Sequence, residues 1–192
     1  VEVVGNVDDG IEWFGGSVDA SDLLVWAQGD DAFDVDQAYS GTISNIMSIS
    51  DNESDHALEI DGPEGSMEAG FSMNSGMFIG YNPDGGEYAD FRSNAMGTLS
   101  GLYFENFSCD SDFELDNDGV AQNAMDGQLS FSNLQFNVSH LSDSCNVSVE
   151  SICLDKSEND IAASFMWDAS ITTSEGVGFD ASQFNGWTCY NN

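Results

Sequence analysis

Three blocks of five residues align without gaps: Asp9-Gly-Ile-Glu-Trp13, Asp31-Ala-Phe-Asp-Val35 and His56-Ala-Leu-Glu-Ile60. The second block starts 22 residues after the first, and the third starts 25 residues after the second. In the last three positions of each block, a carboxylate lies between two apolar side chains, as in a strand with one buried face. A repeat of 22–25 residues built from short strands predicts a solenoid in which each repeat forms one coil.

A second apolar element recurs along the chain. It begins with Gly, a polar residue and an apolar residue, and then has Asn, Asp or Gly just before another apolar residue. It is found at Gly16–Val25, Gly41–Ile46, Gly97–Leu102 and Gly127–Phe136. Together the two elements predict an all-β fold, a right-handed parallel β-helix. The side chains expected to face inward are Ile11, Phe33, Leu58, Phe113, Ile43, Leu99 and Leu129. The alternative is an antiparallel β-sandwich, which also has short strands but does not explain gapless repeats with carboxylates in register.

The whole chain, residues 1–192, is expected to form a single β-helix domain. Helical patterns are nearly absent, while Gly and Ser recur at the predicted turns. Two stretches interrupt the repeat and are predicted to be loop excursions. One is the Gly-rich stretch 62–89, which contains Pro63 and Pro83, and the other is the Ser-, Asp- and Cys-rich stretch 140–160.

The composition excludes several classes of protein. The 192 residues include 35 acidic and 2 basic ones, so the formal net charge is −33. Binding to nucleic acid or to anionic membranes requires basic surfaces, which this chain cannot form. No apolar run reaches the roughly 18 residues of a membrane span, so membrane insertion is not expected either. A content of 41% hydrophobic and 11% aromatic residues favours a folded domain over a disordered acidic chain.

The four cysteines fit no common metal-binding spacing. An even number of cysteines is typical of disulfides formed in an oxidising compartment. The predicted pairs are Cys145 with Cys153, which enclose a short polar loop, and Cys109 with Cys189. The alternative is four buried free thiols.

The chain resembles a family of secreted parallel β-helix proteins of marine bacteria, of the pectin-lyase-like type. The resemblance is carried by Asn6–Gly16, by Gly29–Asp34 with Ser40-Gly41, and by the later segments Asp90–Leu99 and Gly186–Thr188. It covers most of the chain, and its most specific part is Asp8–Gly16. The resemblance implies a β-helix that is secreted, either into the extracellular space or onto the cell surface.

Stacking the coils predicts two outward columns of side chains. One holds Glu12, Asp34, Glu59, Arg92 and Glu114, and the other holds Phe14, Asp36, Asp61, Asn94 and Asp116. Neighbouring coils lie about 4.8 Å apart, and two carboxylates at that spacing repel by about 1 kcal/mol even in water. Arg92, the only arginine, is therefore expected to bridge carboxylates of adjacent coils.

Crowded carboxylates of this kind suit Ca²⁺, which prefers hard oxygen ligands. The segment Asp110–Asp118 is predicted to place acidic side chains on one face of a strand. The candidate metal ligands are Asp30, Asp34, Asp36, Glu59, Asp110, Asp112, Glu114, Asp116 and Asp118. The alternative is a solvated acidic face adapted to high salt, where cations only screen the charges.

A carbohydrate-active protein is the alternative function. The order of motifs on successive coils is similar to that of polygalacturonase-type glycoside hydrolases, in which paired carboxylates act as general acid and base. The catalytic candidates would be Asp9, Asp30 and Asp31, with His56 nearby. The Arg-x-Lys pair of those enzymes has no counterpart, position 57 is Ala rather than Gly, and a net charge of −33 would repel a polyanionic substrate. A carbohydrate-binding module is a further alternative, with tryptophans that stack on sugars.

The ends of the chain favour a structural protein over an enzyme. Val1–Val4 reads as a strand with no cap before it, and Phe184–Tyr190 remains aromatic close to the C-terminus. Open coil ends predict head-to-tail stacking, which produces a filament when the contact does not close into a ring. Val1, Val3 and Val4 would pack against Trp187 and Tyr190 of the next copy. The favoured interpretation is thus a secreted, acidic and cation-stabilised structural protein that forms an extracellular or cell-surface filament.

Overall fold

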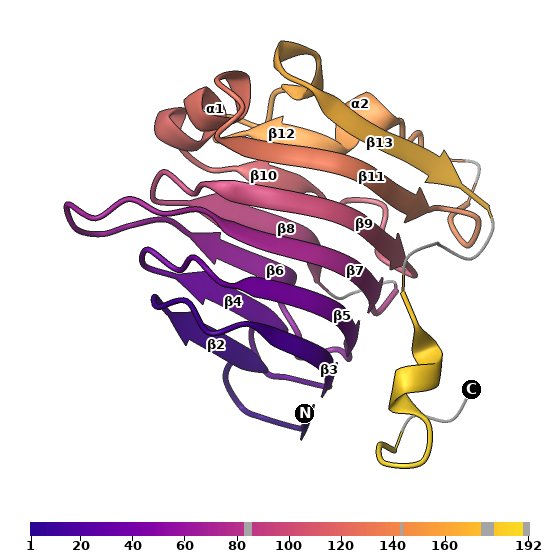
Figure 1. The fold of residues 1–192 in the computed structure, drawn as a ribbon. Helices are drawn as coiled ribbons and strands as arrows, with labels where there is room; N and C mark the ends of the chain where they lie inside the picture. Colours follow the sequence, from indigo (N-terminus) through magenta and orange to yellow (C-terminus); the bar gives the residue numbers. More distant parts are fainter. Residues whose placement is uncertain (83–85, 143, 174–178, 190–192) are drawn as a thin grey trace.

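Two parallel sheets stacked face to face form the body of the molecule (Figure 1). The structure is a computed structural model that describes residues 1–82, 86–142, 144–173 and 179–189. Sheet A consists, in spatial order, of β1 (Glu2–Val4), β3 (Ala20–Trp26), β5 (Thr42–Ile49), β7 (Phe71–Ile79), β9 (Gly97–Glu105), β11 (Leu129–Asn137) and β13 (Trp167–Thr172). Sheet B consists of β2 (Ile11–Phe14), β4 (Phe33–Asp36), β6 (His56–Asp61), β8 (Glu87–Arg92), β10 (Phe113–Leu115) and β12 (Cys153–Asp155).

The chain passes from one sheet to the other and back in every coil, so strands of one sheet are alternate strands of the sequence. Every pair of neighbouring strands is parallel. This confirms the parallel β-helix and excludes the antiparallel sandwich. The aligned blocks of the sequence are β2, β4 and β6, in which Ile11, Phe33 and Leu58 are in register as expected.

The core lies between the two sheets. The side chains predicted to face inward are all buried, apart from Ile11 of the outermost strand of sheet B, which is partly buried against the core. Aromatic rings stack from coil to coil, because in-register residues face the same way in a parallel sheet. Phe78 and Phe104 have ring centroids 4.8 Å apart, and Phe104 and Phe136 have centroids 5.1 Å apart.

A bend with left-handed backbone interrupts the middle strands of sheet A at the same place in each coil. The residues at the bend are Asp22, Asn45, Ser75, Gly101 and Asn133, with φ between 51° and 61°. Gly, Asn and Asp adopt this conformation at low cost, which explains why the sequence motif has one of them just before an apolar residue. Beyond the bend, the outward side chains of sheet A become apolar, and they include Leu24, Met47 and Met77.

The C-terminal segment, residues 179–189, covers this apolar outer stripe. It contains the 3₁₀ helix η2 (Ala181–Phe184), and the Phe184 ring is fully buried against the stripe. The segment is held at one end by Asp180, whose backbone N–H donates to Asn45 Oδ1 at 2.8 Å. Near its other end, the backbone N–H of Cys189 donates to Glu2 Oε1 at 2.8 Å, so the segment runs back to the first strand of the chain.

The predicted loop excursion over residues 62–89 is wrong in part, because β7 and the start of β8 lie within it. Only residues 62–70 and 80–86 connect strands there, and residues 83–85 lie outside the described residues. The stretch 140–160 is closer to the expectation. It leaves the coil but contains α2 (Val149–Ile152) and β12, which extends sheet B by one strand.

Helices play a small part in the fold. The helix α1 (Asp118–Met125) connects β10 to β11, and the Asn117 side chain caps its N-terminus by accepting from the Val120 N–H. The 3₁₀ helix η1 (Ala162–Ser164) precedes β13. No helix in the described part of the chain has the length and apolar character needed to cross a membrane.

The structure has a disulfide between Cys109 and Cys145, so both predicted disulfide pairs are wrong. Cys153 cannot take part in the way expected, because it lies in β12 in register with Phe113 and its thiol is buried in the core. Burial also raises the pKa of the Cys153 thiol. The disulfide that does form ties the excursion after β11 to the chain just before β10.

Candidate functional site

The outward face of sheet B carries a continuous column of carboxylates, which we call the acidic ladder. It consists of Glu12, Asp34, Glu59, Asp90 and Glu114, each in register with the next. The residues on either side of each carboxylate along the strand, such as Phe33 and Val35 beside Asp34, point into the core. The sequence predicted this column correctly except at one position, where Asp90 rather than Arg92 belongs to it.

Arg92 lies two residues further along β8, in register with Asp61 in the second outward column. Asn94 does not belong to that column, because Ser93 and Asn94 form a turn with positive φ after the strand ends. From its position, Arg92 reaches Asp90 Oδ2 with its Nε at 2.5 Å and contacts Glu59 Oε1 with Nη1. Burial opposes the charge of the guanidinium, but Asp90 and Glu59 outweigh it and raise the pKa of Arg92. The expected bridge between adjacent coils is therefore confirmed.

Among the ladder carboxyls that form no ion pair with Arg92, Asp34 is the most deeply buried. Its exposed fraction is 6%, and its Oδ1 atom has no hydrogen-bond partner among the described residues. Burial, followed by the charges of Glu59, Asp9 and Glu12, raises the pKa of Asp34 to about 9. At neutral pH and without a cation, this carboxyl is therefore protonated.

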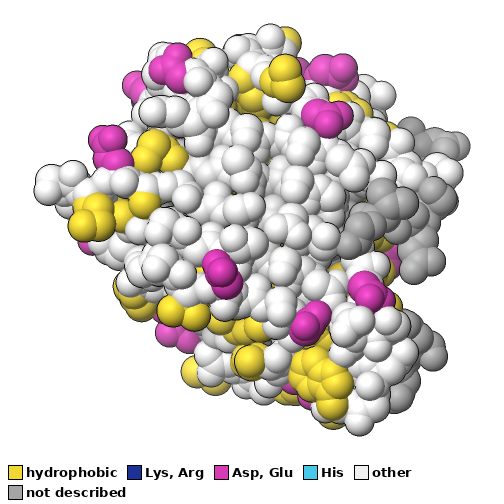
Figure 2. All heavy atoms as spheres, viewed as in Figure 1, with side chains coloured by type: hydrophobic (Ala, Val, Ile, Leu, Met, Phe, Trp, Pro, Cys, Tyr) yellow, Lys and Arg dark blue, Asp and Glu magenta, His cyan; other side chains and the backbone are white. Residues whose placement is uncertain are grey.

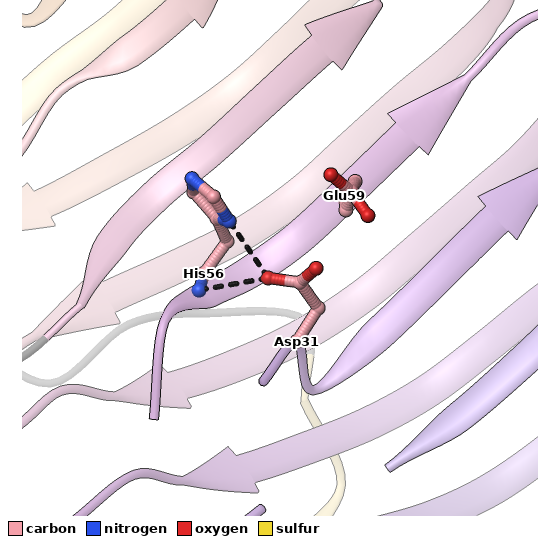
Figure 3. Close-up of side chains that lie close together, drawn as sticks. All are labelled: Asp31, His56 and Glu59. Carbon is pink, nitrogen blue, oxygen red and sulfur yellow. Dashed lines mark hydrogen bonds and ion pairs between the residues drawn. The ribbon is translucent and has the colours of Figure 1, made fainter. Parts of the chain in front are cut away.

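An aspartate–histidine pair lies beside the ladder (Figure 3). Asp31 Oδ1 accepts from the backbone N–H of His56 at 2.9 Å and lies 2.7 Å from His56 Nδ1. Burial disfavours the imidazolium, but the hydrogen bond and the charge of Asp31 raise the pKa of His56 to about 9. Burial likewise works against the charge of Asp31, but its contacts with His56 lower its pKa. The two residues thus form a buried ion pair between neighbouring coils.

Glu59 points toward the same place from β6 (Figure 3). Ligand atoms of Asp31, His56 and Glu59 lie within 4.8 Å of one another. Burial, together with the hydrogen bonding and charge of Asp31, raises the pKa of Glu59 to about 8. One small cluster therefore contains an ionised carboxylate, a protonated imidazole and a carboxyl whose pKa is raised even though the charge of Arg92 opposes the rise.

The four catalytic candidates from the sequence do lie together. Asp9 Oδ1 accepts from the backbone N–H of Asp31 at 3.2 Å, and burial is the main cause that raises the pKa of Asp9 to about 6. Asp30 groups with Asp8 and Asp9 on one side and with Asp31 and Asp55 on the other. The gapless repeat aligns Asp9, Asp31 and His56 at or just before the start of successive strands of sheet B, and Asp30 directly precedes Asp31, which is why the sequence could predict their proximity.

The candidate metal ligands separate into two regions. Asp34 and Glu59 are neighbours in the ladder, Asp30 lies beside the Asp9 group, and Asp36 follows in the second column. The segment Asp110–Asp118 does not place its acidic side chains on one strand face, so that expectation is wrong. Strand β10 is only three residues long, and α1 begins at Asp118, whose carboxylate pairs with Lys156 Nζ at 2.6 Å. Glu114 belongs to the ladder, while Asp116 is exposed at the end of the strand.

Asp110 and Asp112 instead line a pocket of about 520 Å³ at the far end of sheet B, next to the disulfide. Glu158 lines the same pocket. Burial and the charges of Glu114 and Asp90 raise the pKa of Asp112 to about 6. Its Oδ1 atom is buried without a hydrogen-bond partner in the described part of the chain.

Asp90 and Glu87 are acidic residues of this face that the sequence candidates did not include. Asp90 takes the ladder position described above, and Glu87 Oε2 lies 3.7 Å from His56 Nε2. Aligning Ala89-Asp90-Phe91 with Leu58-Glu59-Ile60 would have found Asp90, because both segments place a carboxylate between two inward residues. The longer connection before β8 hides this alignment.

The predicted interface residues do not all lie where a head-to-tail contact would need them. Val1 and Val4 are exposed at 65% and 62%, and Val3 is partly buried in the outermost strand of sheet A. Trp187 is 48% exposed, but it lies on the C-terminal segment that folds back to Glu2 and not at the opposite end of the stack. Its expected role as the surface that receives Val1–Val4 of the next copy is therefore wrong. Tyr190 lies outside the described residues.

Comparison with known proteins supports the fold. A family model described as a pectate-lyase-like β-helix domain matches residues 1–188. No curated protein and no solved structure gives a significant match to the chain.

Proposed function

The chain belongs to the pectate-lyase-like β-helix family, and from this premise we propose that it is a secreted structural protein stabilised by cations. The observation that carries the proposal is the acidic ladder on sheet B. Its carboxylates are in register at the strand spacing of about 4.8 Å. Carboxylates so close together need protons, a base or cations to offset their repulsion.

A single arginine next to the ladder is too little positive charge to neutralise it. Among the described residues, Arg92 forms ion pairs with Glu59 and Asp90 only. At the other end, oxygen atoms of Asp9, Glu12 and Asp34 lie within 4.8 Å of one another. Oxygen ligands in this arrangement suit Ca²⁺, whose charge would replace the proton that Asp34 otherwise holds.

Thermal unfolding with and without divalent cations tests this part of the proposal. A chelator should lower the melting temperature, and millimolar Ca²⁺ should restore it. Binding to the folded form alone adds about 2.7 kcal/mol at a cation concentration a hundred times Kd. The double variant Glu12→Gln/Asp34→Asn should lose the response, whereas Glu53→Gln/Glu68→Gln, which alters exposed carboxylates, should keep it. Equal rescue by sodium at matched ionic strength would contradict a specific site.

The extracellular part of the proposal is supported by the disulfide between Cys109 and Cys145, since disulfides persist in oxidising compartments. Peptide mapping of the protein isolated from its host without reducing agent tests it. The crosslink should be present in material from the medium or the cell surface. A fully reduced, intracellular protein would contradict it.

Assembly by end-to-end stacking is supported by the open edges of sheet A. In the described part of the chain, β1 pairs only with β3, and β13 pairs only with β11. In sheet B, β2 is open, whereas the outer side of β12 has an isolated antiparallel bridge between Leu154 and Asp160. The edges of sheet A are therefore the ones through which the β13 strand of one copy would pair with β1 of the next.

Glycoside hydrolysis is a second candidate, favoured by the cluster at Asp31. Ligand atoms of Asp31 and Glu59 lie within 4.8 Å of each other. Contacts with His56 lower the pKa of Asp31 against the effect of burial, whereas burial and the hydrogen bonding and charge of Asp31 raise the pKa of Glu59 to about 8. Carboxyl groups whose pKa values are pushed apart are typical of acid–base pairs. Release of reducing ends from a panel of polysaccharides, abolished by Asp31→Asn and by Glu59→Gln but not by Glu53→Gln, would support hydrolysis. Activity that survives both substitutions would exclude this cluster as its site.

A further inference from the structure

The outer face of sheet A carries two columns of uncharged polar side chains, which we call the hydroxyl face. They lie on β5, β7, β9 and β11, before the left-handed bends. The first column is Thr42, Ser72, Thr98 and Ser130, and the second is Ser44, Asn74, Ser100 and Ser132. The residues between the two columns, such as Ile43 and Leu99, are buried in the core, so both columns point outward.

The hydroxyl groups of this face are available to a ligand. Within the described residues, none of its Ser and Thr hydroxyls makes a side-chain hydrogen bond, and Asn74 only accepts a long one from Ser75. Each hydroxyl therefore offers one donor and two acceptor positions to a ligand. Repeated at the strand spacing of about 4.8 Å, they form a regular array of hydrogen-bonding groups.

The hydroxyl face is also unusual in its lack of charge. The chain has a net charge of −33, yet the eight side chains of the face include no carboxylate. Figure 2 shows this side of the molecule as an area without charged or apolar side chains, with Asp and Glu scattered toward its border. Asp22 lies beyond the face on β3, and Asp168 lies beyond it on β13.

A hollow adjoins the face where it meets the C-terminal segment. It has a volume of about 410 Å³, and sheet A contributes Asp22, Ser44, Asn45 and Ser75 to its lining. Asp180 and Gln183 of the C-terminal segment complete the lining. The face thus has a raised border along one side, which would guide a chain that lies along it.

We propose that the hydroxyl face binds an uncharged polysaccharide. A polyanion would be repelled by the rest of the molecule, and a neutral chain would not. A protein partner would require an apolar, aromatic-rich centre of the interface, which these columns do not provide. A polyhydroxylated chain instead makes the same weak hydrogen bond many times, and the contacts add up because they are linked. The binding surface is independent of the cations, the assembly and the acid–base cluster proposed above, since its residues lie on β5, β7, β9 and β11, and therefore neither on sheet B nor on the edge strands of sheet A.

Binding to insoluble polysaccharides tests the proposal. The full chain is mixed, in the presence of chelator, with microcrystalline cellulose or with chitin, and with immobilised polygalacturonate as the charged control. We expect binding to at least one uncharged polysaccharide, with little change on adding salt, and none to polygalacturonate. The double variant Ser100→Glu/Ser132→Glu should bind at least about tenfold more weakly. The matched variant Ser66→Glu/Ser157→Glu adds the same charge at exposed positions elsewhere and should bind normally.

A second double variant distinguishes a loss of binding from misfolding. Thr98→Ala/Ser100→Ala removes two hydroxyls without adding charge, and it should weaken binding while the melting temperature stays that of the unaltered protein. Absence of binding to both uncharged polysaccharides would overturn the proposal, as would equal binding by the face variants. Slowed ice growth that the same variants abolish, without polysaccharide binding, would overturn it in favour of ice. Self-association lost in these variants would assign the face to a second copy of the chain.

Discussion

The protonation of Asp34 connects the chemistry of the acidic ladder to the stability of the fold. Its pKa is about 9 in the folded protein and 3.8 in an exposed aspartate. The stabilisation that this difference provides is complete below pH 3.8 and is lost as the pH rises toward 9. The raised pKa values of Glu59 and His56 likewise provide stabilisation that is lost as the pH rises. The lowered pKa of Asp31 provides stabilisation that is present at neutral pH and is lost only in acid.

We therefore expect that, in chelator, the free energy of unfolding falls from pH 6 to pH 9, the interval between the raised pKa values of Asp9 and Asp34. Asn at position 34 cannot ionise, so Asp34→Asn should be more stable than the unaltered protein at the upper end of this range. The gain should be at least about 1 kcal/mol, the cost of a buried unsatisfied charged atom. Urea unfolding at several pH values measures it. Glu68→Gln, at an exposed site, should leave the pH profile unchanged, and a profile that Asp34→Asn does not flatten would contradict the assignment.

The inward residues of the blocks carry the packing energy of the fold. Phe33 is fully buried, with its ring in contact with those of Trp13 and Phe78. Phe33→Ala should therefore lower the free energy of unfolding by roughly 3–5 kcal/mol in urea titrations. Phe14, in the neighbouring coil and 70% exposed, supplies the comparison, since Phe14→Ala should change stability by about 0.5 kcal/mol or less. Similar losses in the two variants would mean that Phe33 is not part of the core stack.

At the scale of elements, the sequence predicted the strands that are joined by connections of regular length and missed strands next to longer connections. The blocks at β2, β4 and β6 align without gaps, so their registers followed from counting residues. Strand β7 was missed because Gly65, Gly70 and Gly76 lie close together in sequence, a pattern that is typical of loops. In the structure Gly76 lies within β7, where the side chains of Phe78 and Leu102 leave no space for a Cβ atom. Arg92 was placed two residues out of register because the preceding connection is longer than the others. Neither the fold of the C-terminal segment nor the disulfide partner follows from local patterns, since both depend on contacts between distant coils.

The C-terminal segment is an element with its own stability. Its attachment depends on Phe184, which is buried among Leu24, Met47 and Met77 and stacks on Phe179 at 5.3 Å. Phe184→Ala should release the segment while the coils remain folded, because the core between the two sheets does not include this ring. Limited proteolysis should then cleave near residues 179–189, and the main melting transition should move little.

Trp187→Ala provides the control for this prediction. Trp187 is 48% exposed, so its loss should increase proteolysis much less than the loss of Phe184. If Phe184→Ala instead lowers the main transition as far as Phe33→Ala does, the segment is part of the cooperative core. A released segment would also uncover the apolar outer stripe of sheet A, which binding of a hydrophobic dye would report.

At the scale of the whole molecule, the two sheets present opposite chemistry to the solvent. The face of sheet B concentrates the carboxylates, the single arginine and the buried aspartate–histidine pair. Sheet A presents the hydroxyl face and the stripe covered by the C-terminal segment. Repulsion between copies of net charge −33 opposes side-by-side packing through sheet B and favours contacts through the ends of the stack.

The last prediction concerns these ends. If β1 of one copy pairs with β13 of another, the sedimentation coefficient should rise with protein concentration, and Ca²⁺ should increase it further by reducing repulsion between copies. A lysine on an edge strand hinders the addition of another strand, so Val4→Lys should yield only monomers. If assembly depended only on the net charge, Val4→Lys would instead promote it, because an added lysine reduces the net negative charge. Met67→Lys, at a site 73% exposed in the connection before β7, makes the same change in charge and should still assemble. A chain that sediments as a monomer at all concentrations with Ca²⁺ present would exclude the filament and leave the acid–base cluster at Asp31 as the first site to test.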